Sequence, residues 1–231
     1  TPFIDSLAGG DSLYPPSLLL LLILDTHRAL GWKLIIHIIL AGWFMYKWIQ
    51  SLHLSKNSAF VAAVAYSMSP VMVTLVHGGQ DGKIFVIALT PLVFWMTESF
   101  LNQPSARNFS LLSLVIGSII LTTHFQMAYF LFMGVSIYFV TKVFLRSPKD
   151  KGRSGRTHFP RRMKLCLGYA LAGIFGLSLA AVQFFPAASY VVDYSRRTST
   201  TVEATAVENR SYSSSWSLHP EEIMGLAVPE F

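Results

Sequence analysis

Long apolar blocks separated by short polar segments dominate this sequence. Several blocks reach the roughly 20 residues that an α-helix needs to cross about 30 Å of hydrocarbon. The pattern predicts an all-α fold, a polytopic transmembrane helical bundle of about six spans. We expect full spans near residues 30–52, 58–76, 83–100 and 165–192, and a short helix followed by a full-length helix within residues 109–145.

Prolines and one polar stretch modify this pattern. The apolar segment 17–24 is too short to cross a membrane, and it follows Pro15-Pro16, which favours a helix start. We expect a short interfacial or re-entrant helix there. Pro70 is expected to kink the second span. The polar residues 122–126 predict a break between the short and the full-length helix, covered by protein or water.

The charged residues fix the orientation that we expect in the membrane. Only 13% of the residues are charged, about half the usual share in soluble proteins, and the net charge is +6. A basic chain could bind nucleic acid, but the basic residues between positions 146 and 164 lie between two apolar spans and face only one acid, Asp150. They are Arg146, Lys149, Lys151, Arg153, Arg156, Arg161, Arg162 and Lys164. This is the pattern of a cytoplasmic loop, with anionic lipid head groups as a compatible partner.

With residues 146–164 on the cytoplasmic side, we expect the chain to have three parts. Residues 1–29 are expected to form an extracytoplasmic loop with the short helix, residues 30–192 the helical bundle, and residues 193–231 an extracytoplasmic polar segment. Lys47, Lys56 and Arg107 then fall on the cytoplasmic side, as the charge rule requires.

This topology collects polar side chains from four segments at the outer face, where they could line a cavity. They are Asp5 and Asp11, then His77, Gln80, Asp81 and Lys83, then His124 and Gln126, and finally Arg196, Arg197, His219, Glu221 and Glu222.

Each of these groups has a chemical and a structural interpretation. Asp5 or Asp11 could act as a general base toward an acceptor hydroxyl, or could only cap turns beside glycines. Lys83 at a helix start could bind a phosphate, or could anchor an external turn. His124 could belong to a site, or be a satisfied buried histidine. Arg196-Arg197 could clamp a phosphate, or anchor the interface.

Metal chemistry finds little support in the sequence. His77, His124 and His219 have no ligand spacing that would indicate a metal site, and Cys166 is the single cysteine. We therefore predict no cofactor, and a divalent cation is not supported by ligand spacing. His37 within an apolar span is expected to form an interhelical hydrogen bond.

Short motifs in a fixed order resemble those of the YfhO-type bacterial membrane proteins, over nearly the whole chain. They are Thr-Pro-Phe-Ile-Asp at 1–5, Leu-Tyr-Pro-Pro at 13–16, His37 with Gly-Trp-Phe-Met-Tyr at 42–46, His-Gly-Gly-Gln-Asp-Gly-Lys at 77–83, Leu-Thr-Pro-Leu at 89–92, Leu-Ala-Ala-Val-Gln at 179–183 with Pro186, and Ser-Trp-Ser-Leu-His-Pro-Glu-Glu at 215–222 with Val-Pro-Glu-Phe at 228–231. The chain resembles an internal part of such a protein.

The resemblance implies a GT-C-like glycosyltransferase in the bacterial cytoplasmic membrane. Such enzymes transfer a sugar from a polyprenyl-phosphate carrier to an acceptor at the outer face, with inversion. An external-loop Asp would be the base, and Asp11 and Asp5 are candidates by position. Basic residues would hold the carrier phosphate, here Lys83, Arg196 and Arg197. The family's leading acidic motif lies outside this chain.

Two other classes remain open. The chain could be a non-catalytic subunit of a larger membrane complex, whose helices pack against other membrane proteins. A transporter is a third possibility, because broken helices and polar groups within the membrane suit it as well.

Overall fold

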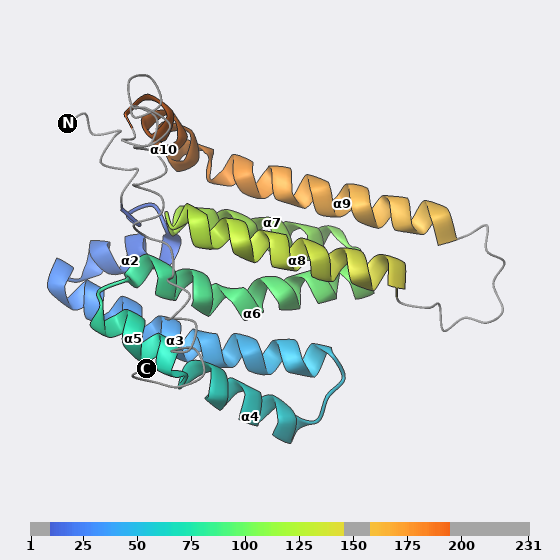
Figure 1. The fold of residues 1–231 in the computed structure, drawn as a ribbon, viewed down its shortest axis with the longest axis horizontal. Helices are drawn as coiled ribbons and strands as arrows, with labels where there is room; N and C mark the ends of the chain where they lie inside the picture. Colours follow the sequence, from blue (N-terminus) through green and yellow to red (C-terminus); the bar gives the residue numbers. More distant parts are fainter. Residues whose placement is uncertain (1–9, 146–157, 195–231) are drawn as a thin grey trace, which may run out of the picture. The chain divides into compact units, whose positions relative to one another are not determined.

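The computed structural model describes residues 10–145 and 158–194, where all regular structure is helical (Figure 1). The all-α prediction is confirmed. The helices are α2 (Pro15–Ile23), α3 (Thr26–Ser51), α4 (Lys56–Ser67), α5 (Pro70–His77), α6 (Asp81–Asn102), α7 (Ala106–Leu121), α8 (Phe125–Leu145), α9 (His158–Leu179) and α10 (Ala181–Tyr194).

Five helical segments are long and apolar enough to cross a membrane, namely Thr26–Ser51, Lys56–His77, Asp81–Asn102, Phe125–Leu145 and Arg161–Leu179. The shorter apolar helix Ala106–Leu121 brings the number of candidate crossings in the described residues to the predicted six. A helix rises 1.5 Å per residue, so the five longer segments, of 19 to 26 residues, match the hydrocarbon thickness. The chain has the helices of a multi-pass membrane protein.

The short helix predicted after the proline pair is confirmed as α2, which begins at Pro15. Proline is favoured in a first helical turn because the amide hydrogens of that turn have no partner within the helix. Only two residues separate α2 from α3, which begins at Thr26, somewhat earlier than expected.

The polar break predicted within 109–145 is also confirmed. α7 ends at Leu121, and Thr123 adopts a left-handed backbone conformation with φ of 63°. Such a conformation cannot continue a right-handed helix and is uncommon for a β-branched residue. The carbonyl of His124 then accepts the amide of Ala128 at 3.0 Å, which begins α8.

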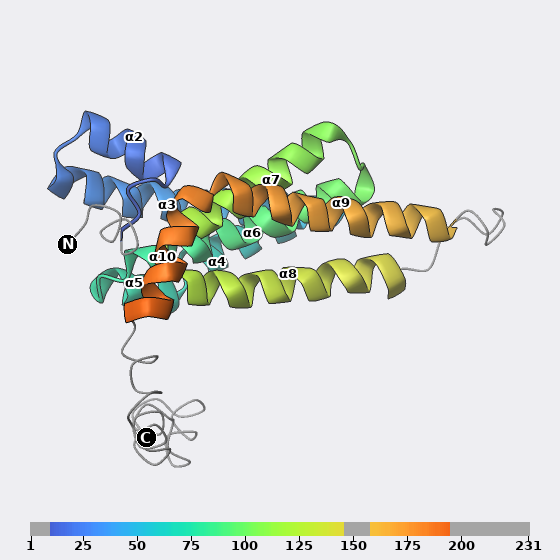
Figure 2. The ribbon, with the colours of Figure 1, turned by 90° about the horizontal axis from the view of Figure 1, so that it is seen from above.

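Two predicted spans are interrupted. Pro70 was expected to kink one helix, but α4 ends at Ser67 and α5 begins at Pro70, because proline removes an amide donor and disfavours helical backbone in the residue before it. The span expected at 165–192 is divided at Ala180 into α9 and α10, and the chain changes direction there (Figure 2). Pro186 lies inside α10.

The described residues up to Ala187 form one compact unit, in which α6 lies at the centre. α6 packs against α3, α7 and α8, and α9 packs against α7 (Figure 1). In its most apolar stretch 67% of α6 is buried, against 11% for the α4–α5 segment, so α6 is a core helix and α4–α5 a peripheral one. Phe85, Val93, Leu112 and Ile119 are fully buried in this core.

α7 and α9 approach closely because glycines face each other. A Cβ added at Gly117 would lie 2.9 Å from the carbonyl oxygen of Gly176. A Cβ at Gly176 would lie 2.6 Å from the side chain of Ile116 and 2.9 Å from the carbonyl oxygen of Ser113. Small residues at membrane helix contacts allow backbones to pack this closely.

This contact predicts that Gly176→Ala destabilises the protein by about 1–3 kcal/mol, because the methyl group overpacks the α7–α9 contact. Gly173→Ala is the matched control, since a Cβ there meets nothing within 4 Å. The melting temperatures of the detergent-solubilised variants measure the difference. Equal melting temperatures would show that this contact is looser than the structure indicates.

Candidate functional site

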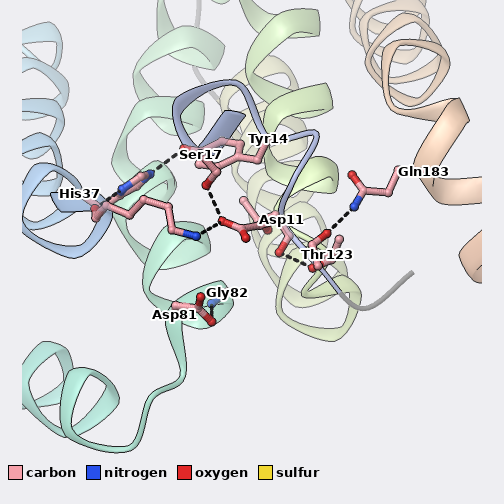
Figure 3. Close-up of polar contacts among 11 residues, drawn as sticks. Asp11, Tyr14, Ser17, His37, Asp81, Gly82, Thr123 and Gln183 are labelled. Carbon is pink, nitrogen blue, oxygen red and sulfur yellow. Dashed lines mark hydrogen bonds and ion pairs between the residues drawn. The ribbon is translucent and has the colours of Figure 1, made fainter. Parts of the chain in front are cut away.

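A polar network surrounds Asp11, in the loop before α2 (Figure 3). Its carboxylate oxygen Oδ2 accepts a hydrogen bond from Lys33 Nζ at 2.8 Å and another from the hydroxyl of Ser17. The side chain of Lys33 is 5% exposed and that of Asp11 17% exposed. Asp11 is therefore held by two residues, one on α3 and one on α2.

The ammonium group of Lys33 is buried within the helix bundle and has two favourable contacts. The first is the ion pair with Asp11, and the second is the ring of Phe85, whose centre lies 5.4 Å from Nζ. A buried charge without a partner costs several kcal/mol, so the Asp11 loop and α3 are tied together.

Tyr14 and His37 continue the network. His37 Nδ1 lies 2.6 Å from the carbonyl oxygen of Lys33, which can only accept, so Nδ1 carries a hydrogen. His37 Nε2 lies 2.8 Å from the Tyr14 hydroxyl, which donates to it when the imidazole is neutral. Burial raises the pKa of Tyr14 above its ordinary value, and Asp11 raises it further, which keeps this hydroxyl protonated. His37 was expected to bond to another helix; its side-chain partner is instead Tyr14, the residue that precedes α2.

Two further elements reach this end of the bundle. Gln183 of α10 donates from Nε2 to the carbonyl oxygen of Gly10 at 2.6 Å (Figure 3). At the start of α6, a Cβ on Gly82 would lie 3.4 Å from the carbonyl oxygen of Thr122 and 3.6 Å from His124 Cβ. The Asp11 loop, the start of α6 and the α7–α8 break therefore lie in one region.

His124 and Lys83 are close enough to interact electrostatically. Partial burial lowers the pKa of His124 below its ordinary value, and the charge of Lys83 lowers it further. The amide of Met127 donates to His124 Nδ1 at 3.4 Å, which requires that nitrogen to be unprotonated. We conclude that His124 is neutral at pH 7 and that Lys83 supplies the positive charge beside it.

The other candidate residues lie apart from this network or outside the described residues. His77, Gln80 and Gln126 are exposed, and the half-buried Asp81 accepts the amide of Gly82 at 2.9 Å. The candidates outside the described residues are Asp5, Arg196, Arg197, His219, Glu221 and Glu222. Within the described ranges, no three His, Cys, Asp or Glu side chains come close enough to hold a metal ion.

An apolar cavity of about 400 Å³ lies beside this region, between α7, α8, α9 and the start of α10. Its lining includes Phe125 and Phe132 of α8, Tyr169 and Gly173 of α9, and Phe184 of α10. Two of its lining residues, Phe125 and Phe184, directly follow His124 and Gln183 in the sequence. Its volume is in the range of ligand pockets in proteins.

A second ion pair, between the buried Glu98 and the half-buried Lys142, lies near the other end of α6. Glu98 is 2% exposed, and its Oε2 lies 3.1 Å from Lys142 Nζ and accepts the Tyr138 hydroxyl at 2.5 Å. Asp81 and Glu98 are 17 residues apart in one helix, about 25 Å along its axis. The pair joins α6 to α8 far from Asp11.

Comparison with protein families decides the class of this chain. A family model described as "Bacterial membrane protein YfhO" matches residues 16–218, most of its length. The chain belongs to the YfhO family. No curated protein and no solved structure gives a match. The resemblance inferred from the motifs is confirmed, and this YfhO-family match includes Ser17 and Lys33 but begins after Asp11.

Sequence reasoning missed four residues of the network in this YfhO-family chain: Tyr14, Ser17, Lys33 and Gln183. Lys33 carried a signal, because a lysine within an apolar span is expensive and usually has a partner. The same signal marked Glu98. Tyr14 and Gln183 stood in the family-like motifs without a role assigned to them. Ser17 is an ordinary residue by type that lies six positions after Asp11, whereas only the fold brings Gln183 to Gly10.

The lowered pKa of His124 predicts a pH dependence of stability. The unfolded chain binds a proton on this histidine near pH 6.5, whereas the folded chain binds it only at lower pH. The free energy of unfolding therefore decreases as the pH falls through about 6.5. We expect the melting temperature to fall less between about pH 7.5 and 5.5 in His124→Gln than in wild type.

The matched control for this experiment is His27→Gln, at an exposed histidine near the start of α3. It should retain the wild-type pH dependence. If His124→Gln loses stability with pH as steeply as wild type, His124 is not protected from protonation in the folded protein.

Proposed function

We propose that this YfhO-family protein is a GT-C-like glycosyltransferase that moves a sugar from a polyprenyl-phosphate carrier to an acceptor hydroxyl. The observation that carries this proposal is the arrangement of the Asp11 carboxylate. Lys33 and Ser17 both bind Oδ2, whereas Oδ1 accepts no hydrogen bond from the described residues. A carboxylate fixed by one oxygen has the other available as a general base.

The proposed reaction is an inverting displacement. The acceptor hydroxyl oxygen forms a bond to the anomeric carbon of the sugar while its proton passes to Asp11 Oδ1. The bond between the anomeric carbon and the phosphate oxygen breaks, and the electron pair leaves with the polyprenyl phosphate. Negative charge thus develops on the departing phosphate, where a positive side chain stabilises the transition state.

Lys83 is the proposed phosphate residue among those described. It lies in the first turn of α6, where backbone amides and the helix dipole favour an anion, and next to the neutral His124. His77, Gln80, Asp81, His124 and Gln126 are proposed to shape the sugar site. Arg196, Arg197, His219 and Glu221 remain predictions from the sequence, and so does Asp5 as an alternative base.

The isoprenoid tail of the carrier is proposed to occupy the apolar cavity between α7, α8 and α9. Phe125 lines the cavity and directly follows His124, and a Cβ on Gly82 would lie 3.6 Å from His124 Cβ, so a tail in the cavity is compatible with a phosphate near the start of α6. This requires the Asp11 end of the bundle to face outward and the basic loop at 146–164 to face the cytoplasm, as the charge distribution predicts.

The test of the base is sugar transfer by Asp11→Asn. The full-length protein in liposomes receives radiolabelled polyprenyl-phosphate glucose, galactose or N-acetylglucosamine, with membranes of a deletion strain as the source of acceptor. Loss of a general base lowers kcat by about 10²–10⁴-fold. We expect a loss in this range for Asp11→Asn.

The matched control is Asp25→Asn, at an exposed aspartate before α3 whose side chain makes no capping hydrogen bond. It should keep the wild-type kcat. If Asp11→Asn keeps full activity, Asp11 is not the base. The activity of Asp5→Asn would then be measured. A wild-type protein that transfers none of the sugars would favour the accessory-subunit interpretation.

The variant Gly173→Leu tests whether the isoprenoid tail occupies the apolar cavity. Gly173 lines the cavity and a Cβ there meets nothing within 4 Å, so the side chain of a leucine is expected to occupy part of the cavity. Excluding part of the lipid tail is expected to raise KM for the lipid-linked donor about tenfold or more, with a smaller effect on kcat.

Gly134→Leu on α8 is the matched control, because a Cβ at Gly134 also meets nothing within 4 Å and the residue does not line the cavity. Its KM should equal that of wild type. Equal KM values for the two leucine variants would place the tail elsewhere.

A further inference from the structure

We propose that Lys33 is a positioning residue for Asp11, which fixes one carboxylate oxygen and thereby directs the other toward the acceptor hydroxyl. The inference rests on the proposed function, in which Asp11 is the base. It assigns a role to a residue in the apolar part of α3 that no motif or family feature singled out. Its basis is a closed set of contacts between α3 and the Asp11 loop.

Lys33 contacts the loop through its side chain and through its main chain. The side chain binds Asp11 Oδ2 at 2.8 Å. The carbonyl oxygen accepts His37 Nδ1 at 2.6 Å, and His37 Nε2 binds the Tyr14 hydroxyl at 2.8 Å. The ring closes through the amide of Tyr14, which donates to the carbonyl oxygen of Asp11 at 2.9 Å. Contacts with one turn of α3 thus hold both the backbone and the carboxylate of Asp11 in position.

The contacts of Lys33 are unsuited to binding the carrier phosphate directly. Its side chain is 5% exposed, its ammonium group is paired with Asp11, and the ring of Phe85 lies beside it. A phosphate would have to displace a buried ion pair to reach it. Lys83, which is half-buried at the start of α6, is the more accessible cation.

Protein stability alone also does not explain the ion pair between Lys33 and Asp11. Buried ion pairs cost desolvation energy and can often be replaced by apolar residues without loss of stability. A cation also fixes the direction in which a carboxylate points, and this is the role proposed for Lys33. A base displaced by about 1 Å can lose on the order of 10²-fold in rate.

The closing experiment measures kcat and KM of the full-length protein with the donor that wild type uses. Lys33→Gln is expected to lower kcat on the order of 10²-fold without changing KM, because Lys33 does not touch the donor. Lys33→Arg keeps the charge on a longer, planar group, so its kcat should lie between those of wild type and Lys33→Gln. If Lys33→Gln does not fold, the kcat of Lys33→Arg alone tests the positioning role.

Lys142→Gln is the matched control, because it removes the lysine of the other ion pair within the bundle, with the buried Glu98, far from Asp11. It should leave kcat unchanged, whatever it does to the melting temperature. Three results would overturn the positioning role: wild-type kcat in either folded Lys33 variant, an effect on KM alone, or an equal loss of kcat in Lys142→Gln.

These results are separable from a failure of the proposed function. If wild type is active and the Lys33 variants have the same kcat, the positioning role of Lys33 is rejected. The glycosyltransferase proposal is then still supported. A wild type that is inactive with every sugar donor rejects the glycosyltransferase, and the role of Lys33 falls with it.

Discussion

A charged ammonium group inside a bundle of apolar helices has to be neutralised by a neighbour, and Lys33 is neutralised by a loop residue, Asp11. This requirement joins the short helix α2 and the loop before it to α3. Tyr14 and His37 add a hydrogen bond between the same two segments, and Gln183 holds Gly10 from α10. The polar end of the bundle is therefore organised around one buried charge.

The helices could be predicted because their lengths are set by the bilayer and their ends by local chemistry. Proline before α2 and the polar residues around Thr123 act within a few residues, so the sequence reveals them. The division at Ala180 was not predicted, because it falls within an apolar stretch and the nearby Pro186 lies inside α10 and not at the break. Asp11 was a candidate from its loop, and its role stays a prediction. The bond between Gln183 and Gly10 joins residues 173 positions apart, a contact that only the folded chain can reveal.

The proposed chemistry needs two environments side by side, and the described residues contain both. Around Asp11 and Lys83 the chain offers charges and hydrogen bonds, whereas the cavity between α7, α8 and α9 is lined by aromatic and aliphatic side chains. A lipid-linked sugar has the same division, with a polar head and an apolar tail. The close approach of α7 and α9 at Gly117 and Gly176 fixes one wall of that cavity.

The position of α6 has a mechanical consequence. Phe85 near one end lies against Lys33, and Glu98 near the other end is paired with Lys142, about 20 Å away along the helix axis. A rod restrained at two such points resists both rotation about its axis and sliding along it. α6 is therefore held near both ends, and α4 and α9 are attached to it mainly through α3 and α7.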